Sequence, residues 1–184
     1  MDDDVQAIRR LKRGDIGGLE MLVTRYQVKA ARAAFLITHD EATAEDVVQE
    51  TFIRLYQRIR QFDETRPFEP YLMRSVVNAA LNVARRANKS ITLDDDTGAV
   101  EALLVRSASV ESQVEFAQLK REILSALSKL SPRQRAVIVQ RYYLEMSEQE
   151  MADALDAAPG TVKWLLNVAH TRLRNLLGSK RSAE

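Results

Sequence analysis

Hydrophobic residues recur at steps of three and four along most of this chain, a spacing that places them on one face of an α-helix. Leu19, Leu22 and Tyr26 follow this spacing, and so do Val48 and Phe52. Alternating runs of β-branched residues, which would indicate strands, are absent from the sequence. The pattern predicts an all-α protein with helices over approximately residues 5–12, 15–37, 41–60, 71–87, 114–130, 132–143, 148–155 and 160–177.

Residues that cap or interrupt helices mark the boundaries of these segments. We expect Asp15 to cap the second helix and His39-Asp40 to end it. Ser131 precedes Pro132, the order typical of an N-cap followed by proline at the first helical position. Ser147 has a glutamate three residues later, which is the pattern of a capping box. Both serines therefore predict the start of a helix.

A change in composition near residue 88 indicates two domains. Residues 91–112 carry five acidic side chains and one arginine, so their net charge is −4. A polar, acidic stretch of this kind is typical of an irregular or flexible linker. We expect a four-helix domain over residues 1–88, a linker over 89–112 and a second helical domain over 113–184. Residues 61–70 contain two prolines and are predicted to form a loop in the first domain.

Composition excludes several classes of protein. The chain has no cysteine and two histidines, which excludes disulfides, thiolate metal sites and a histidine-rich metal centre. Its net charge of +1 excludes a histone-like polycation. No apolar run approaches the roughly 20 residues of a membrane span, and the acidic Met1–Asp4 start is unlike a signal peptide. We expect a cytoplasmic protein without a cofactor. The sequence has no recognisable catalytic set and no phosphate-binding loop, so we do not expect an enzyme.

Charge is distributed unevenly between the predicted helices. No acidic residue occurs between Pro70 and Leu93 or between Ala157 and Ala183, although several arginines and lysines do. Residues 33–53 show the opposite bias, with five acids and no lysine or arginine. Basic helices suit phosphate groups, whereas an acidic helix suits a basic protein surface. The sequence thus predicts both a nucleic-acid and a protein partner.

The segment from Ser147 to Leu166 has the pattern of a helix-turn-helix motif. Ala152 is small where the two helices must cross closely. If Val162 and Leu166 are buried, the second helix turns Lys163, Trp164, Asn167, Val168, Thr171 and Arg174 outward. Side chains such as Asn167 read base edges or hold phosphates. A packing corner without any DNA role is the alternative. Trp164 either stacks against a partner or folds back onto the preceding helix.

These segments together resemble an extracytoplasmic-function (ECF) sigma factor of bacterial RNA polymerase. The resemblance rests on two blocks. The first is Ala44-Glu-Asp-Val-Val-Gln-Glu-Thr-Phe-Ile-Arg-Leu55 with Phe62 and Tyr71-Leu-Met-Arg-Ser-Val-Val-Asn78, and the second is Leu130-Ser-Pro-Arg-Gln-Arg135 with Arg141-Tyr-Tyr, Met151-Ala152 and Gly160-Thr-Val-Lys163. The family has two helical domains, called regions 2 and 4. The resemblance implies that residues 1–88 form region 2 and residues 113–184 form region 4.

In this family the helix that corresponds to residues 41–60 docks on the largest subunit of core RNA polymerase. Its positions off the apolar stripe are the ones available for docking. The resemblance therefore implies a polymerase-binding face made of Asp46, Gln49, Glu50, Ile53, Arg54 and Gln57.

The resemblance also implies that the loop 61–70 and the following helix read and melt the −10 element as single-stranded DNA. Asn78 and Asn82 lie one helical turn apart, and asparagine is a poor helix former, which favours a role beyond local structure. The family more often has aspartate at position 82 and tryptophan at position 71. The implied −10 contacts are Arg66, Tyr71, Arg74, Asn78, Asn82, Arg85 and Arg86.

The last helix resembles the reader of the double-stranded −35 element, which lies in the major groove. The implied contacts are Thr161, Lys163, Trp164, Asn167, Thr171 and Arg174. The family usually has several arginines after the Gly160–Lys163 block, where this chain has Trp164, Leu165 and Val168. Fewer cations predict weaker and less salt-sensitive binding there.

The resemblance implies three partners, namely core RNA polymerase, promoter DNA and an anti-sigma factor. It implies a sigma factor that directs promoter-specific transcription initiation, without membrane insertion. Two alternatives are a stand-alone helix-turn-helix regulator and a helical adaptor that binds only protein. The acidic and basic helices within one domain argue against the first, and the Gly160–Lys163 block argues against the second.

Overall fold

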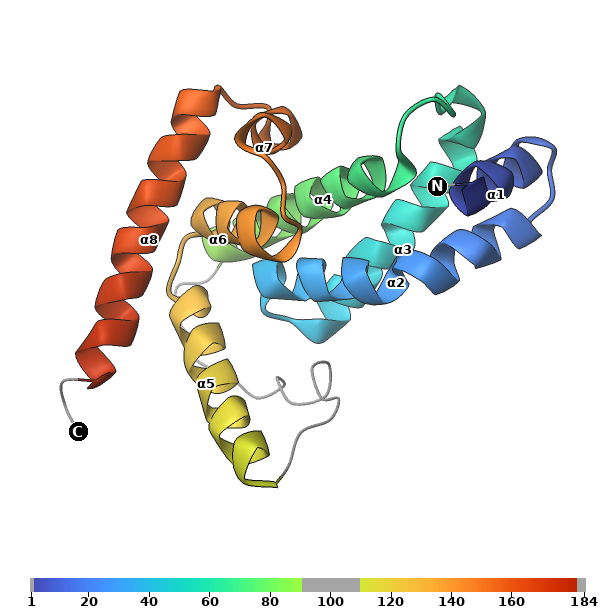
Figure 1. The fold of residues 1–184 in the computed structure, drawn as a ribbon. Helices are drawn as coiled ribbons and strands as arrows, with labels where there is room; N and C mark the ends of the chain where they lie inside the picture. Colours follow the sequence, from blue (N-terminus) through green and yellow to red (C-terminus); the bar gives the residue numbers. More distant parts are fainter. Residues whose placement is uncertain (1, 91–109, 182–184) are drawn as a thin grey trace.

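The computed structural model describes residues 2–90 and 110–181, and throughout these ranges the regular structure is helical (Figure 1). The expected all-α class is confirmed. The N-terminal domain contains α1 (Asp2–Lys12), α2 (Gly17–Thr38), α3 (Glu41–Arg58), the 3-10 turn η1 (Ile59–Gln61) and α4 (Phe68–Ser90). The C-terminal domain contains α5 (Val110–Ser128), α6 (Pro132–Ile138), the π-helical turn η2 (Val139–Tyr143), α7 (Glu148–Leu155) and α8 (Pro159–Arg181).

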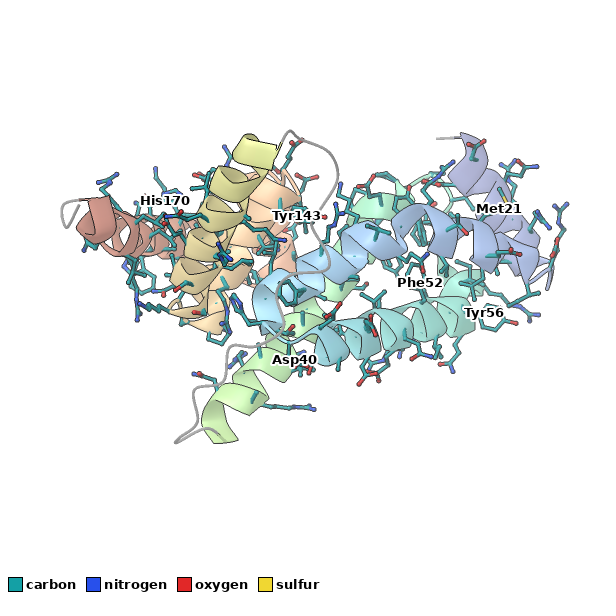
Figure 2. All side chains as sticks on the ribbon, turned by 90° about the horizontal axis from the view of Figure 1, so that it is seen from below. Met21, Asp40, Phe52, Tyr56, Tyr143 and His170 are labelled. Carbon is teal, nitrogen blue, oxygen red and sulfur yellow. The ribbon has the colours of Figure 1, made fainter. Side chains whose placement is uncertain are left out.

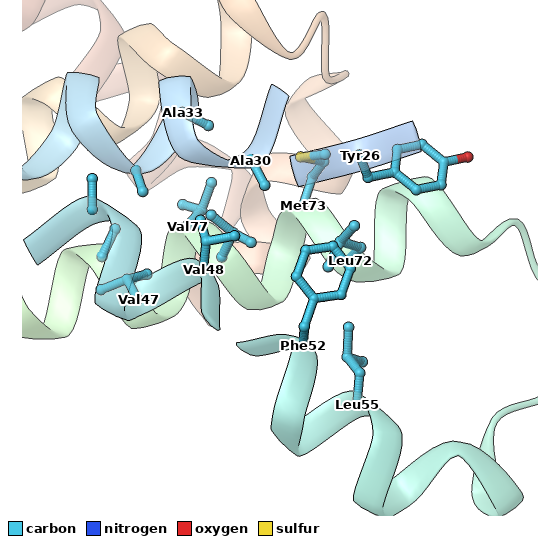
Figure 3. Packing of buried hydrophobic residues seen from close by; sticks show 14 of the residues in the cluster. Tyr26, Ala30, Ala33, Val47, Val48, Phe52, Leu55, Leu72, Met73 and Val77 are labelled. Carbon is cyan, nitrogen blue, oxygen red and sulfur yellow. The ribbon is translucent and has the colours of Figure 1, made fainter. Parts of the chain in front are cut away.

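The core of the N-terminal domain lies between α2, α3 and α4. Leu72 and Val77 of α4 are fully buried, and Phe52 of α3 packs beside them (Figure 3). The short side chains of Ala30 and Ala33 allow α2 to approach its neighbours closely. Burial of these apolar side chains, worth on the order of 2 kcal/mol for each large one, drives the helices together.

Helix α1 packs on α2 through a close approach of the two backbones. A Cβ atom added at Gly18 would lie 2.2 Å from the carbonyl oxygen of Ala7. Glycine therefore permits the crossing because any side chain would strike backbone atoms. This contact fixes α1 beside the start of α2, at the same end of the domain as the loop before α4 (Figure 1).

The C-terminal domain has its own apolar core. Val137 of α6, Met151 of α7 and Val162 of α8 are fully buried in it. Ala152 is also buried, as expected for the close crossing of α7 and α8. The two predicted serine caps are confirmed: Ser131 and Ser147 each accept a hydrogen bond from the backbone at N3, within complete capping boxes.

Several helix boundaries differ from the sequence-based expectation. Asp15 is not the N-cap of α2; its carboxylate accepts from the N–H of Gly17 while Ile16 occupies the cap position. Helix α4 begins at Phe68, because proline is tolerated in the first turn of a helix, so the loop spans residues 62–67. The segment predicted as one helix to Tyr143 becomes π-helical after Ile138. Helices extend into both ends of the expected linker, whose residues 91–109 lie outside the described ranges.

The two domains pack against each other. Helices α6 and α7 contact α4, and both α6 and η2 contact α2. Tyr143 lies where the C-terminal domain meets α2, and its hydroxyl has Arg32 of α2 as a hydrogen-bonding partner (Figure 2). Leu36, Leu144 and Leu155 touch the apolar cores of both domains. The sequence contained no pattern that predicted this contact.

Candidate functional surfaces

The outward face of α3 is exposed along its whole length. Val47 and Phe52 are among the residues on the buried side of α3. The opposite side of the helix points to solvent. Ile53 is 48% exposed, and Glu50 pairs with Arg54 one turn later. All six residues expected to bind polymerase share this exposed face, namely Asp46, Gln49, Glu50, Ile53, Arg54 and Gln57. The face combines carboxylates, amides and one apolar side chain.

Side chains within the loop 62–67 form hydrogen bonds that contribute to its shape. The Asp63 carboxylate accepts from the backbone N–H and the hydroxyl of Thr65 at 3.0 and 2.7 Å. These two hydrogen bonds hold the pKa of Asp63 below its usual value. The backbone N–H of Arg66 donates to the carbonyl of Asp63, and the Arg66 side chain is exposed. The loop is a short, preorganised turn rather than an extended strap.

Aromatic rings close the base of this loop. Phe62 and Phe68, at its two ends, stack edge to face with ring centres 5.7 Å apart. Tyr71 packs on Phe62 at 4.9 Å and keeps an exposed edge, and Tyr26 packs on Phe68. The packing role expected for the aromatic residue at position 71 is therefore present. It presents a ring to solvent directly beside the loop.

One face of α4 carries the remaining residues expected at the −10 element. Positions 71, 74, 78, 82 and 85 follow one another at steps of three or four, so they line one side of the helix, and position 86 lies next to the last of them. Arg74, Asn82, Arg85 and Arg86 are exposed, whereas Asn78 is only half-buried between its neighbours. At 1.5 Å per residue this row extends over about 22 Å. The exposed side chains at the C-terminal end of this row carry amide or guanidinium groups.

The N-terminal part of that row faces the other domain. Arg74 lines a hollow together with the C-terminal end of α7 and the turn that follows it. Asp153 and Asp156 are the acidic residues in this hollow, which Ala152, Ala157 and Ala158 complete. Two acidic residues therefore line the same hollow as an arginine that the sequence predicts to meet DNA phosphate. Asp156 adopts a left-handed backbone with φ of 47° at the C-cap of α7, as its position in a tight turn required.

The outward face of α8 is free of the protein core. Trp164 is 61% exposed, so it does not fold back onto the preceding helix, and the stacking alternative remains. Val162 and Ala169 anchor the opposite face. The six residues expected to read the −35 element are all exposed, namely Thr161, Lys163, Trp164, Asn167, Thr171 and Arg174. The face is polar with one large aromatic ring.

Two sets of contacts at these surfaces could not be predicted from the sequence pattern. His170 of α8 shares a 2.7 Å hydrogen bond with the hydroxyl of Tyr142, an exposed residue of η2. Arg9 and Lys12 of α1 bind the loop 62–67 through Glu64. The partners are 28 and about 52–55 residues apart, and helical periodicity carries no information on pairs so distant.

Two buried polar side chains lie in α6 and η2, the elements that contact α2. Arg135 of α6 is almost fully buried, and its Nε has no hydrogen-bonding partner among the described residues. Burial lowers its pKa to about 10. Gln140 is completely buried, with neither end of its amide bonded to any described residue. An unpaired buried polar group lowers the free energy of unfolding by about 1–3 kcal/mol, so these side chains reduce the stability of the part of the chain that holds them.

Comparison with known proteins gives the class of protein that carries these surfaces. Residues 22–90 match the family model of sigma-70 region 2, and residues 120–167 match that of sigma-70 region 4. The chain is 30% identical to the ECF RNA polymerase sigma factor SigW of Bacillus subtilis over 92% of this chain and 94% of that protein. The region 2 match precedes the region 4 match along the chain, which is the expected order.

Solved structures share the fold. CnrH, in complex with the cytosolic domain of CnrY, superposes with a TM-score of 0.66 at 26% identity, over 97% of this chain and 99% of that one. The sigma factor RpoE of Bartonella quintana, in complex with the anti-sigma factor NepR, has a TM-score of 0.65 at 21% identity, over 86% and 94% of the two chains.

The chain therefore belongs to the ECF sigma factors, which direct RNA polymerase to specific promoters. This family assignment replaces the two alternatives considered from the sequence, a stand-alone regulator and a helical adaptor. In the part of the chain that the structure describes, no helix is both long and apolar enough to cross a membrane.

Proposed function

We propose that this chain binds core RNA polymerase through α3, melts and reads the −10 element with the loop 62–67 and α4, and anchors on −35 duplex through α8. The observation that supports it best is the separation of three exposed faces with different chemistry on one small chain. Residues 1–88 would act as region 2 and residues 113–184 as region 4. The chain would work in the cytoplasm and perform no catalysis itself.

The α3 face suits a basic partner surface. Asp46 and Glu50 supply negative charge, Gln49 and Gln57 supply amide donors and acceptors, and Ile53 offers an apolar anchor near the centre. An exposed isoleucine flanked by polar groups resembles the composition of a protein interface more than that of an ordinary solvated helix face. These six residues would form the docking surface.

The loop and α4 suit unpaired bases. A base leaving the duplex needs an aromatic ring to stack on, hydrogen-bonding groups for its edge and cations for its phosphates. Tyr71 offers a ring edge, Asn78 and Asn82 offer amides, and Arg66, Arg74, Arg85 and Arg86 offer cations along the same side. The row therefore contains every element that capture of a melted strand requires.

Helix α8 suits the major groove. Its outward face is exposed for more than two turns, and Asn167 has the amide that reads adenine while Lys163 and Arg174 have charges for guanine or phosphate. Two cations on this face predict a modest salt dependence for −35 binding. Trp164 would stack on or pack against the DNA.

Action on a promoter would require the two domains to separate. The −10 and −35 elements lie on the order of 85 Å apart along the duplex, taking 25 base pairs at 3.4 Å each. A compact folded chain of this length has a radius of gyration of about 16 Å. The contact of α6 and α7 with α4 is thus incompatible with simultaneous binding of both elements, and the buried Nε of Arg135 on α6, which has no hydrogen-bonding partner among the described residues, would make the contact easier to open.

An anti-sigma factor is the third proposed partner. CnrH was solved with the cytosolic domain of CnrY, and its fold and 26% identity extend over nearly all of this chain. A partner that binds across both domains would hold them together and keep α4 from DNA.

Run-off transcription with purified core polymerase and a genomic promoter library tests the proposal. We expect discrete transcripts that require the added chain. A folded chain that binds core polymerase and yields none would contradict the proposed function. Replacing Ile53 by aspartate should abolish the binding of core polymerase, whereas Gln27→Glu, an exposed change on α2, should leave it intact.

A further inference from the structure

Helix α1 lies outside the matched region 2 model, which begins at residue 22, yet two of its side chains bind the loop 62–67. The ammonium of Lys12 donates to the carbonyl oxygen of Phe62 at 2.7 Å, at the residue where the loop begins. The same ammonium lies 3.0 Å from one carboxylate oxygen of Glu64. One cation therefore holds both the backbone and a side chain of the loop.

Arg9, one turn earlier on α1, binds the other oxygen of the same carboxylate. Its Nε donates to Glu64 at 2.9 Å. The Glu64 carboxylate is 27% exposed and Lys12 is 25% exposed, so these pairs are partly shielded from water, whereas Arg9 is 63% exposed. Screening is weaker at such sites than on an open surface, which strengthens the contact of Lys12 relative to that of Arg9.

We infer that Arg9 and Lys12 are positioning residues for the loop 62–67, which they hold in the shape that accepts melted promoter DNA. The inference rests on the proposed role of this loop at the −10 element. Neither residue needs to touch DNA, because both act through Glu64 and the carbonyl of Phe62.

Electrostatics explain why the loop needs this support. Glu64 is a carboxylate in a segment that would face phosphates, and a free carboxylate there would repel the strand. Arg9 and Lys12 neutralise it and draw it toward α1. The other carboxylate of the loop, Asp63, accepts from Thr65 and pairs with Arg66, and the exposed side chains of Thr65 and Arg66 present a hydroxyl and a cation that suit nucleic acid.

Promoter opening by holoenzyme reconstituted from core polymerase and the full chain tests the inference. The probe is a promoter fragment with 2-aminopurine in the −10 element, whose fluorescence rises as bases unstack. We expect the double variant Arg9→Met with Lys12→Met to open the fragment about tenfold more slowly, while binding core polymerase normally. Lys12→Arg should recover part of the rate. Arg10→Met, a change on the same helix that breaks the pair of Arg10 with Asp15 in the following turn, is the matched control and should open at the normal rate.

A double-mutant cycle separates positioning from direct DNA contact. If Lys12 acts through Glu64, the effects of Glu64→Gln and Lys12→Met on the rate of opening should be less than additive. The salt dependence of opening should then be unchanged. If Lys12 contacts a phosphate, its loss should lower the salt slope by about one, and Glu64→Gln should not alter its effect; that result would overturn the inference.

Normal opening by the double variant would also overturn it. Failure of the unmodified chain to open any promoter would instead contradict the proposed function. Thermal unfolding of each variant distinguishes a specific defect from loss of the fold, because opening is compared at a temperature where all variants are folded.

Discussion

Arg135 of α6 and His39 at the C-terminus of α2 lie close enough that the arginine charge acts on the imidazole across the contact between the two domains. Burial, and then this neighbouring cation, lower the pKa of His39 from 6.5 to about 4. Its Nε2 has no hydrogen-bonding partner among the described residues, and no carboxylate of the described chain pairs with Arg135. Like charge would therefore accumulate here if His39 were protonated.

The pKa of His39 predicts a loss of stability in acid. Because the folded-state pKa lies below the unfolded value, the neutral imidazole contributes stability above pH 6.5, and this contribution is lost as the pH falls from 6.5 towards 4. Between pH 7 and 4.5 the loss should be about 2 kcal/mol, measured by urea unfolding. His39 has a left-handed backbone with φ of 60°, so His39→Asn, which tolerates that conformation, is the matched control. An equal acid-induced loss in this variant would contradict the assignment.

Replacement of Arg135 by an apolar residue should not destabilise the protein. Arg135→Met removes a buried charge that lacks an acidic partner and retains most of its volume, so we expect the free energy of unfolding to stay the same or rise by about 1–2 kcal/mol. Thermal unfolding measures it. The exposed neighbour Arg133, changed in the same way, should shift stability by less than about 0.5 kcal/mol. A large loss with Arg135→Met would mean that the charge has a stabilising partner.

Gly18→Ala should weaken the packing of α1 on α2. The new methyl group would lie 2.2 Å from the carbonyl oxygen of Ala7, and backbone atoms on both sides must move. Such overpacking costs about 1–3 kcal/mol, which chemical denaturation can measure. Gly178→Ala places its methyl group where no atom lies within 4 Å and should be neutral or slightly stabilising. Equal effects from the two changes would contradict the close approach.

The capping box of α7 should contribute to the stability of region 4. Ser147→Ala removes the hydroxyl that accepts from the N–H of Glu150, and we expect a loss of about 1 kcal/mol in unfolding free energy. Ser125→Ala, at an exposed position within α5, provides the comparison and should not destabilise. A loss below about 0.3 kcal/mol with Ser147→Ala would show that water replaces the cap without penalty.

Trp164→Ala tests the −35 face directly. Because the ring is largely exposed, its removal should leave thermal stability unchanged. Transcription from promoters that depend on the −35 element should fall several-fold, and fluorescence of this single tryptophan should be quenched by −35 duplex in holoenzyme. Unchanged transcription together with unquenched fluorescence would exclude a DNA contact for Trp164.

Local features of this fold were predictable because they depend on neighbours along the chain. The 3.6-residue periodicity located the helices, and short-range hydrogen bonds placed the caps at Ser131 and Ser147. The same periodicity separated the exposed faces of α3 and α8 from the core. Errors had two causes: α4 begins before Pro70 because proline is tolerated in the first turn of a helix, and the helix after Pro132 becomes π-helical over Val139–Tyr143, where the side chain of Gln140 is completely buried.

The sequence by itself determined the helical class, the two-domain order, the family and the residues that each exposed helix face presents, since all of these depend on composition and on spacings of a few residues. Only the tertiary structure decided that α1 binds the loop 62–67, that the charge of Arg135 acts on His39 and that Arg74 lines a hollow with the acidic end of α7. Those relationships join residues tens of positions apart, and the free energy that selects them comes from packing whole helices together, which no local pattern encodes.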